Sequence, residues 1–128
     1  MEFPYEPDLD DRMRDMEPEL YRLLTRDITS LGRWDALRFF LEMEQEQATM
    51  DEIGMAAGRD SAPMLSILGA LTSLGWLTRR TDESGETLYQ LTREQERRQL
   101  LDRFHDAIHD RTFRLQAMYH WTRGKLEE

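Results

Sequence analysis

The sequence predicts a mainly helical fold that carries one small β-hairpin. The chain contains eighteen leucines, few isoleucines and no valine, a usage that favours helices over sheets. Apolar residues recur at helical spacing through most of its length. One turn-rich stretch, residues 82–86, separates two short runs with strand character. Because the chain has 128 residues and no cysteine, we expect one domain of ordinary size whose core needs no disulfide.

The first third of the chain predicts an acidic arm followed by two helices. Residues 1–17 hold two prolines and many acidic residues, which is typical of an extended arm. A helix is expected to start at Pro18 and to be broken at residues 30–32. A second helix follows and ends in the polar residues 44–47. The residues at helical spacing are Leu20, Leu23, Leu24, Ile28 and Leu31 in the first helix, and Trp34, Leu37, Phe40, Leu41 and Met43 in the second.

Residues 49–75 carry the signals of two helices joined by a tight turn. Thr49 and Glu52 have the spacing of a capping box, in which hydroxyl and carboxylate bind the first free amides of a helix. Gly58 can adopt the left-handed conformation that ends this helix. A second helix is expected to be capped at residues 60–61 and closed by a glycine. Its predicted core stripe consists of Leu65, Leu68, Leu71 and Leu74.

A hairpin is predicted directly after the second helix. Residues 76–81 and residues 87–91 are short runs with strand character. Between them, the sequence Asp-Glu-Ser-Gly-Glu supplies residues that favour a turn. The order helix, turn, helix, hairpin is that of a winged helix.

A long helix is predicted after the hairpin. Thr92 and Gln95 have the spacing of a second capping box, and the helix they open is expected to span about thirty residues. Because it carries more apolar surface than a small domain covers, we interpret residues 93–124 as a dimerisation helix beyond a winged domain at residues 18–92, with a tail at residues 125–128. The alternative is a helix that folds back on its own domain. The residues expected at the dimer interface are Leu101, Phe104, Ile108, Leu115, Met118 and Tyr119.

Four short motifs follow one another through the predicted helix-turn-helix and hairpin. They are Thr49-x-x-Glu52-Ile53-Gly54, then Gly58, then Leu68-x-x-Leu71-x-x-Leu74-Gly75-Trp76-Leu77-x-Arg79-Arg80, then Tyr89-x-Leu91-Thr92. With these motifs the chain resembles the winged helix-turn-helix regulators of the broad MarR and ArsR type. The resemblance implies that the second helix enters the DNA major groove and that residues 48–49 form a minor strand beside the hairpin. It also implies a homodimeric, cytoplasmic transcriptional regulator that binds duplex DNA.

The DNA contacts that the resemblance implies are poor in charge. The outward positions of the second helix offer hydroxyl and apolar groups, whereas direct base readout relies on Arg, Lys, Asn or Gln. Asp82, Glu83 and Glu86 stand at the tip of the hairpin, where members of the family usually carry basic residues. We therefore expect weak direct base readout. The residues expected to contact DNA are Arg59, Ser61, Ser66, Ile67, Ala70, Ser73, Arg79 and Arg80.

The distribution of charge leaves a second function open. Residues 1–60 hold seven arginines and sixteen acidic residues, which accounts for the whole net charge of −9. Residues 61–128 hold ten basic and ten acidic residues, so an acidic first half can point away from DNA. Alternatively, the uncharged face of the second helix, formed by Pro63, Met64, Ile67 and Ala70 and rimmed by the acidic hairpin, docks another protein. A steep salt dependence favours DNA, and a shallow one favours an apolar contact.

The sequence predicts no catalytic site, cofactor or metal site. It has no cysteine nucleophile, no Gly-x-Ser-x-Gly and no glycine-rich phosphate loop, so we expect no enzyme. His105 and His109 are spaced one helical turn apart and are the candidate metal ligands, but this pattern is more typical of a solvated helix face. The uncharged residues 61–78 are interrupted by proline and glycine, so they predict a buried helix and no membrane contact.

Overall fold

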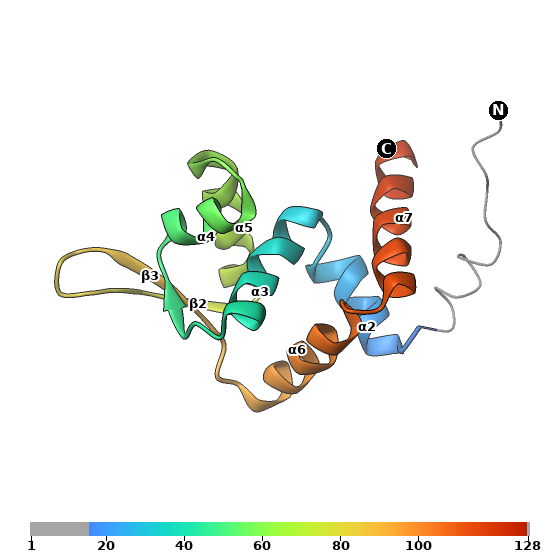
Figure 1. Cartoon of the computed structure of the whole chain (residues 1–128), viewed down its shortest axis with the longest axis horizontal. Helices are drawn as coiled ribbons and strands as arrows, with labels where there is room; N and C mark the ends of the chain where they lie inside the picture. Colours follow the sequence, from blue (N-terminus) through green and yellow to red (C-terminus); the bar gives the residue numbers. More distant parts are fainter. Residues whose placement is uncertain (1–15, 128) are drawn as a thin grey trace.

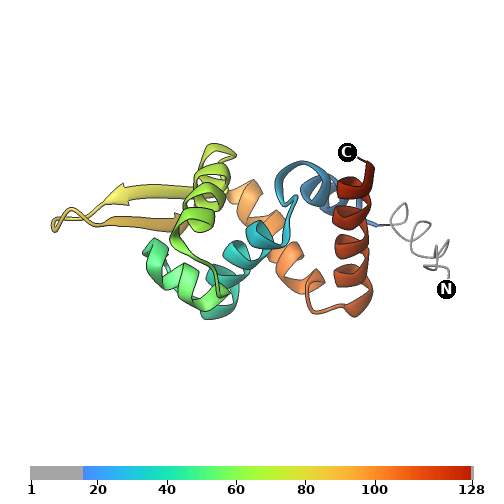
Figure 2. The same cartoon turned by 90° about the horizontal axis from the view of Figure 1, so that it is seen from above.

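The computed structural model describes residues 16–127, with side chains through residue 123. The three strands of this part form one antiparallel sheet in the order β1-β3-β2. The β2–β3 hairpin and α7 lie at opposite ends of the molecule (Figures 1 and 2). The predicted arm, residues 1–17, lies outside the described residues except at residues 16 and 17. The elements are α2 (Pro18–Arg22), the π-helix η1 (Leu23–Asp27), α3 (Leu31–Met43), β1 (Gln47–Ala48), α4 (Met50–Ala57), α5 (Ser61–Ser73), β2 (Leu77–Thr81), β3 (Thr87–Leu91), α6 (Gln95–Ala107) and α7 (Arg111–Glu127).

The first helix of the helix-turn-helix forms as its capping signals predict. Thr49 Oγ1 accepts a hydrogen bond from the amide of Glu52 at 3.2 Å, and Glu52 Oε1 accepts one from the amide of Thr49 at 3.1 Å. Gly58 ends α4 with a φ of 68°, in the left-handed region that glycine tolerates. A Cβ at Gly54 would lie 3.0 Å from the carbonyl oxygen of Arg59. Small residues therefore let α4 turn closely into α5.

Acid is expected to weaken the capping box of α4. The amide of Thr49 donates a hydrogen bond to Glu52 and lowers the pKa of that carboxyl below 4.5. Because the folded-state pKa lies below the unfolded one, the stabilisation is present at neutral pH and is lost as pH falls below 4.5. We expect Glu52→Gln to unfold at lower urea concentration than the wild type at neutral pH. The difference should shrink as pH falls through the lowered pKa of Glu52; a difference that does not change with pH contradicts this assignment.

The buried face of α5 differs from the predicted stripe at its first position. Met64, Leu68 and Leu71 are fully buried, whereas Leu65 is 56% exposed. Each step of three residues turns a helix through about 300°, so four residues at this spacing rotate through about 180° in total and cannot all face the core. Met64 therefore occupies the place predicted for Leu65, and Leu74 is half-buried.

The register of α5 can be tested with a matched pair of leucines. We expect Leu68→Ala to lower the free energy of unfolding by about 2–5 kcal/mol, because the buried site cannot collapse around the smaller side chain. Leu65→Ala should change it by less than about 0.5 kcal/mol, because the side chain is exposed. Urea unfolding of both variants measures the difference. Equal losses of unfolding free energy would show that Leu65 is buried, as the sequence predicted.

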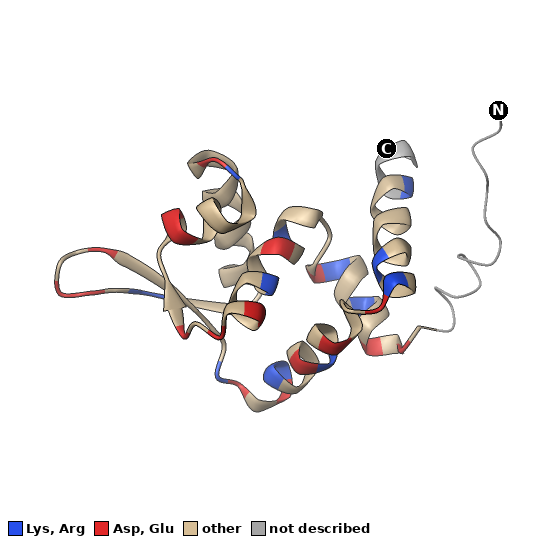
Figure 3. Cartoon of the chain, viewed as in Figure 1, with Lys and Arg blue, Asp and Glu red and all other residues tan. Residues whose placement is uncertain are grey.

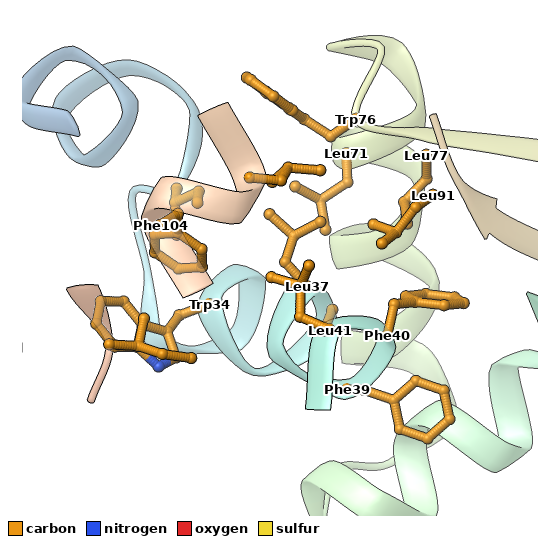
Figure 4. Packing of buried hydrophobic residues seen from close by; sticks show 14 of the residues in the cluster. Trp34, Leu37, Phe39, Phe40, Leu41, Leu71, Trp76, Leu77, Leu91 and Phe104 are labelled. Atoms are coloured by element: carbon orange, nitrogen blue, oxygen red, sulfur yellow. The ribbon is translucent and has the colours of Figure 1, made fainter. Parts of the chain in front are cut away.

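One hydrophobic core joins the helix-turn-helix to the other helices. α3 lies at its centre and packs against both α4 and α5. Figure 4 shows Leu37 and Phe40 of α3 near Leu71, Leu77 and Leu91, which come from α5 and the hairpin. Within residues 16–127, no helix has both the length and the apolar character required to cross a bilayer.

The hairpin forms at the predicted position. β2 and β3 pair in register from Leu77 opposite Leu91 to Thr81 opposite Thr87. Gly85 takes a φ of 86° in the connecting turn, a conformation that favours glycine. The minor strand predicted at residues 48–49 lies one residue earlier, as β1.

The continuous C-terminal helix predicted for residues 93–124 is wrong, because the chain breaks at residues 108–110. Asp110 Oδ1 accepts a hydrogen bond from the amide of Thr112 at 3.0 Å, so Asp110 starts α7 as a new helix. The second capping box is also wrong. Thr92 Oγ1 accepts a hydrogen bond from the amide of Glu94 at 3.2 Å, and α6 begins after Glu94 without a side-chain cap.

The N-terminal helix starts at Pro18 as predicted, but it ends earlier than expected. The segment continues as a single π-helical turn and stops at Ile28. Ser30 does not break this helix; its Oγ accepts a hydrogen bond from the amide of Arg33 at 3.3 Å and caps α3. The residues predicted as a break therefore open the next helix.

α7 folds back on its own chain through the apolar face that carries Phe113, Ala117 and Trp121. The Trp34 ring of α3 stacks on Phe113, with ring centroids 5.7 Å apart, and meets Trp121 edge-on at 5.6 Å. Phe104 of α6 packs edge-on against the same indole at 5.1 Å. Trp121 Nε1 donates a hydrogen bond to the carbonyl oxygen of Ile28 at 3.1 Å. One aromatic cluster thus ties α3, α6 and α7 together.

Candidate nucleic-acid interface

The outward face of α5 is uncharged. The helix carries no acidic or basic residue, in contrast to the elements around it (Figure 3). Ser61, Ser66 and Ser73 are exposed, and Ala70 is half-buried. Ile67 is also half-buried, because its side chain packs on α3 so closely that a Cβ at Gly32 would lie 2.5 Å from Ile67 Cδ1. This face therefore offers hydroxyl and methyl groups to a ligand, and Ile67 contributes less than predicted.

Arg59, a predicted DNA contact, is held by α3. Its Nη2 lies 3.2 Å from Asp35 Oδ2, and the two side chains are only 30% and 23% exposed. Its Nε is buried without a hydrogen-bond partner among the described residues. An arginine in this setting stabilises the junction of α3 and α5, and its half-buried side chain is less available to a phosphate than predicted. Asp35 gave no signal in the sequence, because its partner is 24 residues away.

Arg79 and Arg80 lie on opposite faces of the hairpin. Successive side chains of a strand point to opposite faces. Arg79 is paired with the buried Tyr89, on the face that packs against the helices, and has no ion-pair or hydrogen-bond partner among the described residues. On the other face, Arg80 Nη2 donates a hydrogen bond to Gln47 Oε1 at 2.6 Å. Only Arg79 is therefore placed on the same side as α5.

The tip of the hairpin is negatively charged at neutral pH. Asp82, Glu83 and Glu86 cluster there (Figure 3). The Ser84 hydroxyl donates a hydrogen bond to Asp82 Oδ1 at 2.6 Å, and the amide of Glu86 donates another at 2.9 Å. These bonds hold the pKa of the Asp82 carboxyl below its ordinary value. The hairpin tip therefore repels phosphate at neutral pH.

The predicted dimer residues divide into two groups. Leu101, Phe104 and Ile108 are buried in the core of their own chain, so they are not available to a partner. Leu115 and Met118 of α7 are 43% and 48% exposed, and Tyr119 is half-buried. Leu115 and Met118 line an open cavity of about 330 Å³ between α3 and α7, together with Leu31, which is also 43% exposed. The exposed face that carries Leu115 and Met118 is thus the part of the predicted interface that remains open.

The sequence matches no family model, and no curated protein is significantly similar to it. Three solved structures nevertheless share its fold. A MarR-family transcriptional regulator from Silicibacter pomeroyi is 20% identical, with a TM-score of 0.54, over 95% of this chain and 87% of that one. A second MarR-family regulator from Silicibacter pomeroyi is 14% identical, with a TM-score of 0.56, over 99% and 97%. BpsR of Bordetella bronchiseptica, whose DNA binding is regulated by 6-hydroxynicotinic acid, is 15% identical, with a TM-score of 0.54, over 94% and 82%. The chain has the winged-helix fold of MarR-type transcriptional regulators, as the motifs between residues 49 and 92 predict.

Proposed function

We propose that this chain is a homodimeric, cytoplasmic transcriptional regulator that binds duplex DNA with weak sequence readout. The observation that carries the proposal is the exposed, uncharged face of α5 beside a projecting hairpin that offers Arg79 from the same side. Ser61, Ser66 and Ser73 contact sugar and phosphate groups, and Ala70 contacts thymine methyl groups. Arg79 neutralises phosphate, and Arg59 and Arg80, which each hold one partner within the chain through Nη2, contribute through their remaining donors.

Weak readout follows from the chemistry of this face. The bidentate side chains that distinguish base pairs in the major groove are absent from α5. Two labelled duplexes of equal length and unrelated sequence test the proposal by fluorescence anisotropy. Both should bind at low salt, with affinities that differ by far less than the roughly 10³-fold or more of specific regulators. Absence of binding to both at low salt contradicts the function, and a ratio of about 10³ contradicts weak readout.

The dimer forms, in this proposal, through the open face of α7. Leu31, Leu115 and Met118 are large apolar side chains that no described residue covers fully. Pairing these faces about a two-fold axis would present two α5 helices to successive major grooves, about one helical turn apart.

Sedimentation equilibrium tests the dimer. Leu115→Asp/Met118→Asp places two charges in the proposed interface and should convert a dimer to a folded monomer. Met55→Asp, at a methionine that is 86% exposed on α4, is the matched control and should leave the dimer intact. A dimer that survives the double change shows that the interface lies elsewhere.

The second candidate is a module that docks a protein. Of the predicted docking face, Pro63 is exposed, but Met64 is buried in the core. Leu65 on α5 and Met55 on α4 are large exposed apolar side chains, and the tip of the hairpin is acidic. A basic or apolar partner surface fits these features. In that case Leu65→Asp abolishes binding of the partner, and the interaction depends only weakly on salt.

A further inference from the structure

Three metal-ligating side chains from distant parts of the sequence converge on one point of the surface. Glu42 lies near the end of α3, His105 lies on α6, and His109 lies in the turn that follows α6. Glu42 Oε1 is 3.6 Å from His105 Nε2 and 3.2 Å from His109 Nε2. All three ligand atoms lie within 4.8 Å of one another. We propose that Glu42, His105 and His109 bind a divalent transition-metal ion, with Zn²⁺ as the best fit.

The spacing of the ligand atoms matches a tetrahedral site. Zinc binds histidine nitrogen and carboxylate oxygen at about 2.0–2.2 Å, which places two ligand atoms of a tetrahedron about 3.3–3.6 Å apart. The two distances to Glu42 Oε1, 3.6 Å and 3.2 Å, lie at these values. The His109 side chain is 62% exposed, so it can rotate to close the remaining edge without disturbing the core. Water takes the fourth position.

The donor set selects the class of metal. Two imidazoles and one carboxylate suit zinc and its neighbours in the first transition row. Magnesium and calcium require oxygen ligands in larger number, which this cluster lacks. The side chains of Glu42 and His105 are each about one-third exposed, so an ion can reach them from solvent.

A simple ion-pair cluster explains the arrangement less well. If both imidazoles were protonated, two cations with ring centroids 5.2 Å apart would face a single carboxylate oxygen. Arg38 Nε already lies 3.9 Å from the same oxygen, so the cluster would hold three cations around one anion. In the proposed site, the Nε2 atoms of His105 and His109 and Glu42 Oε1 would share one metal ion, whose charge the carboxylate offsets.

Metal binding at this site would fasten α6 to α3. Because α3 packs against both helices of the helix-turn-helix, the ion joins the DNA-facing half of the molecule to the C-terminal helices. The site does not depend on DNA binding, and its test is independent of it.

Titration of Zn²⁺ into the untagged protein, in competition with a chromophoric chelator, tests the site. The wild type should bind one Zn²⁺ per chain. Glu42→Gln, His105→Gln and His109→Gln should each weaken binding at least about tenfold, because loss of a direct ligand costs no less than loss of its supporting groups. His120→Gln is the matched control, since His120 lies on α7 against Tyr21, with ring centroids 6.3 Å apart, outside the cluster. Wild-type affinity in the His105→Gln/His109→Gln variant, or no saturable binding by the wild type, overturns the site.

Thermal unfolding gives a second readout. Zn²⁺ should raise the Tm of the wild type and of His120→Gln, and at the same Zn²⁺ concentration should raise the Tm of the three ligand variants less. Far-UV circular dichroism before addition of metal confirms that each variant is folded. An equal rise in Tm with Mg²⁺ would overturn the assignment to a transition metal.

Discussion

Trp34→Ala is expected to lower the free energy of unfolding by about 3–5 kcal/mol. Trp34 is 4% exposed and lies between Phe104, Phe113 and Trp121. Its removal leaves a cavity that three aromatic rings on two other helices cannot fill together. Urea unfolding at neutral pH measures the loss.

The control for this change is an exposed leucine of α7. Leu115→Ala should alter the free energy of unfolding of the monomer by less than about 0.5 kcal/mol, because the side chain is 43% exposed. The pair of variants also tests how α7 is attached. A loss below about 1 kcal/mol for Trp34→Ala would show that α7 does not pack on α3 in solution.

Reversing the charge of the hairpin tip is expected to strengthen DNA binding more than tenfold at low salt. Glu83→Lys/Glu86→Lys removes two anions that repel phosphate and adds two cations. Each new phosphate contact should steepen the slope of log K against log salt by about 0.9. Asp82 is kept, because it accepts the hydrogen bonds that hold the turn.

The control for the hairpin reverses the same number of charges elsewhere. Glu96→Lys/Asp106→Lys changes two exposed residues of α6, away from the hairpin (Figure 1). It alters the net charge identically and should change the affinity for duplex DNA much less. Equal gains from the two double variants would mean that net charge alone governs binding and that the hairpin does not contact DNA.

Local signals in the sequence were sufficient for the helix-turn-helix and the hairpin. The capping box of Thr49 and Glu52, the helix-ending Gly58 and the Gly85 turn each act within a few residues, and each lies where predicted. Strand alternation was also available from the sequence. Applied to Arg79 and Arg80, it places the two side chains on opposite faces, which the prediction of a joint DNA contact overlooked.

The break between α6 and α7 had a weaker signal. Asp110 is a residue type that favours a helix start, but the stretch around it contains neither proline nor glycine. The helical spacing of the apolar residues on both sides therefore predicted one continuous helix. The error moved Leu101, Phe104 and Ile108 from the core to an expected interface.

Contacts between distant residues could not be predicted from one sequence. The ion pair of Arg59 and Asp35 makes a predicted DNA contact less available, and it depends on how α3 lies against α5. The approach of Glu42 to His105 likewise depends on the packing of α3 beside α6. Helical spacing identified the two histidines, but only the tertiary fold supplied the carboxylate.

The most direct test of the proposed function is the anisotropy of a labelled mixed-sequence duplex at low and moderate salt, measured with the wild type, Arg79→Ala and Arg80→Ala. The wild type should bind at low salt, with log K falling linearly against log salt. Arg79→Ala should weaken binding and make the slope shallower by about 1 for each chain in contact, whereas Arg80→Ala should change it less. No binding by the wild type at low salt, or binding by Arg79→Ala equal to that of the wild type, would contradict a DNA-binding face formed by α5 and Arg79.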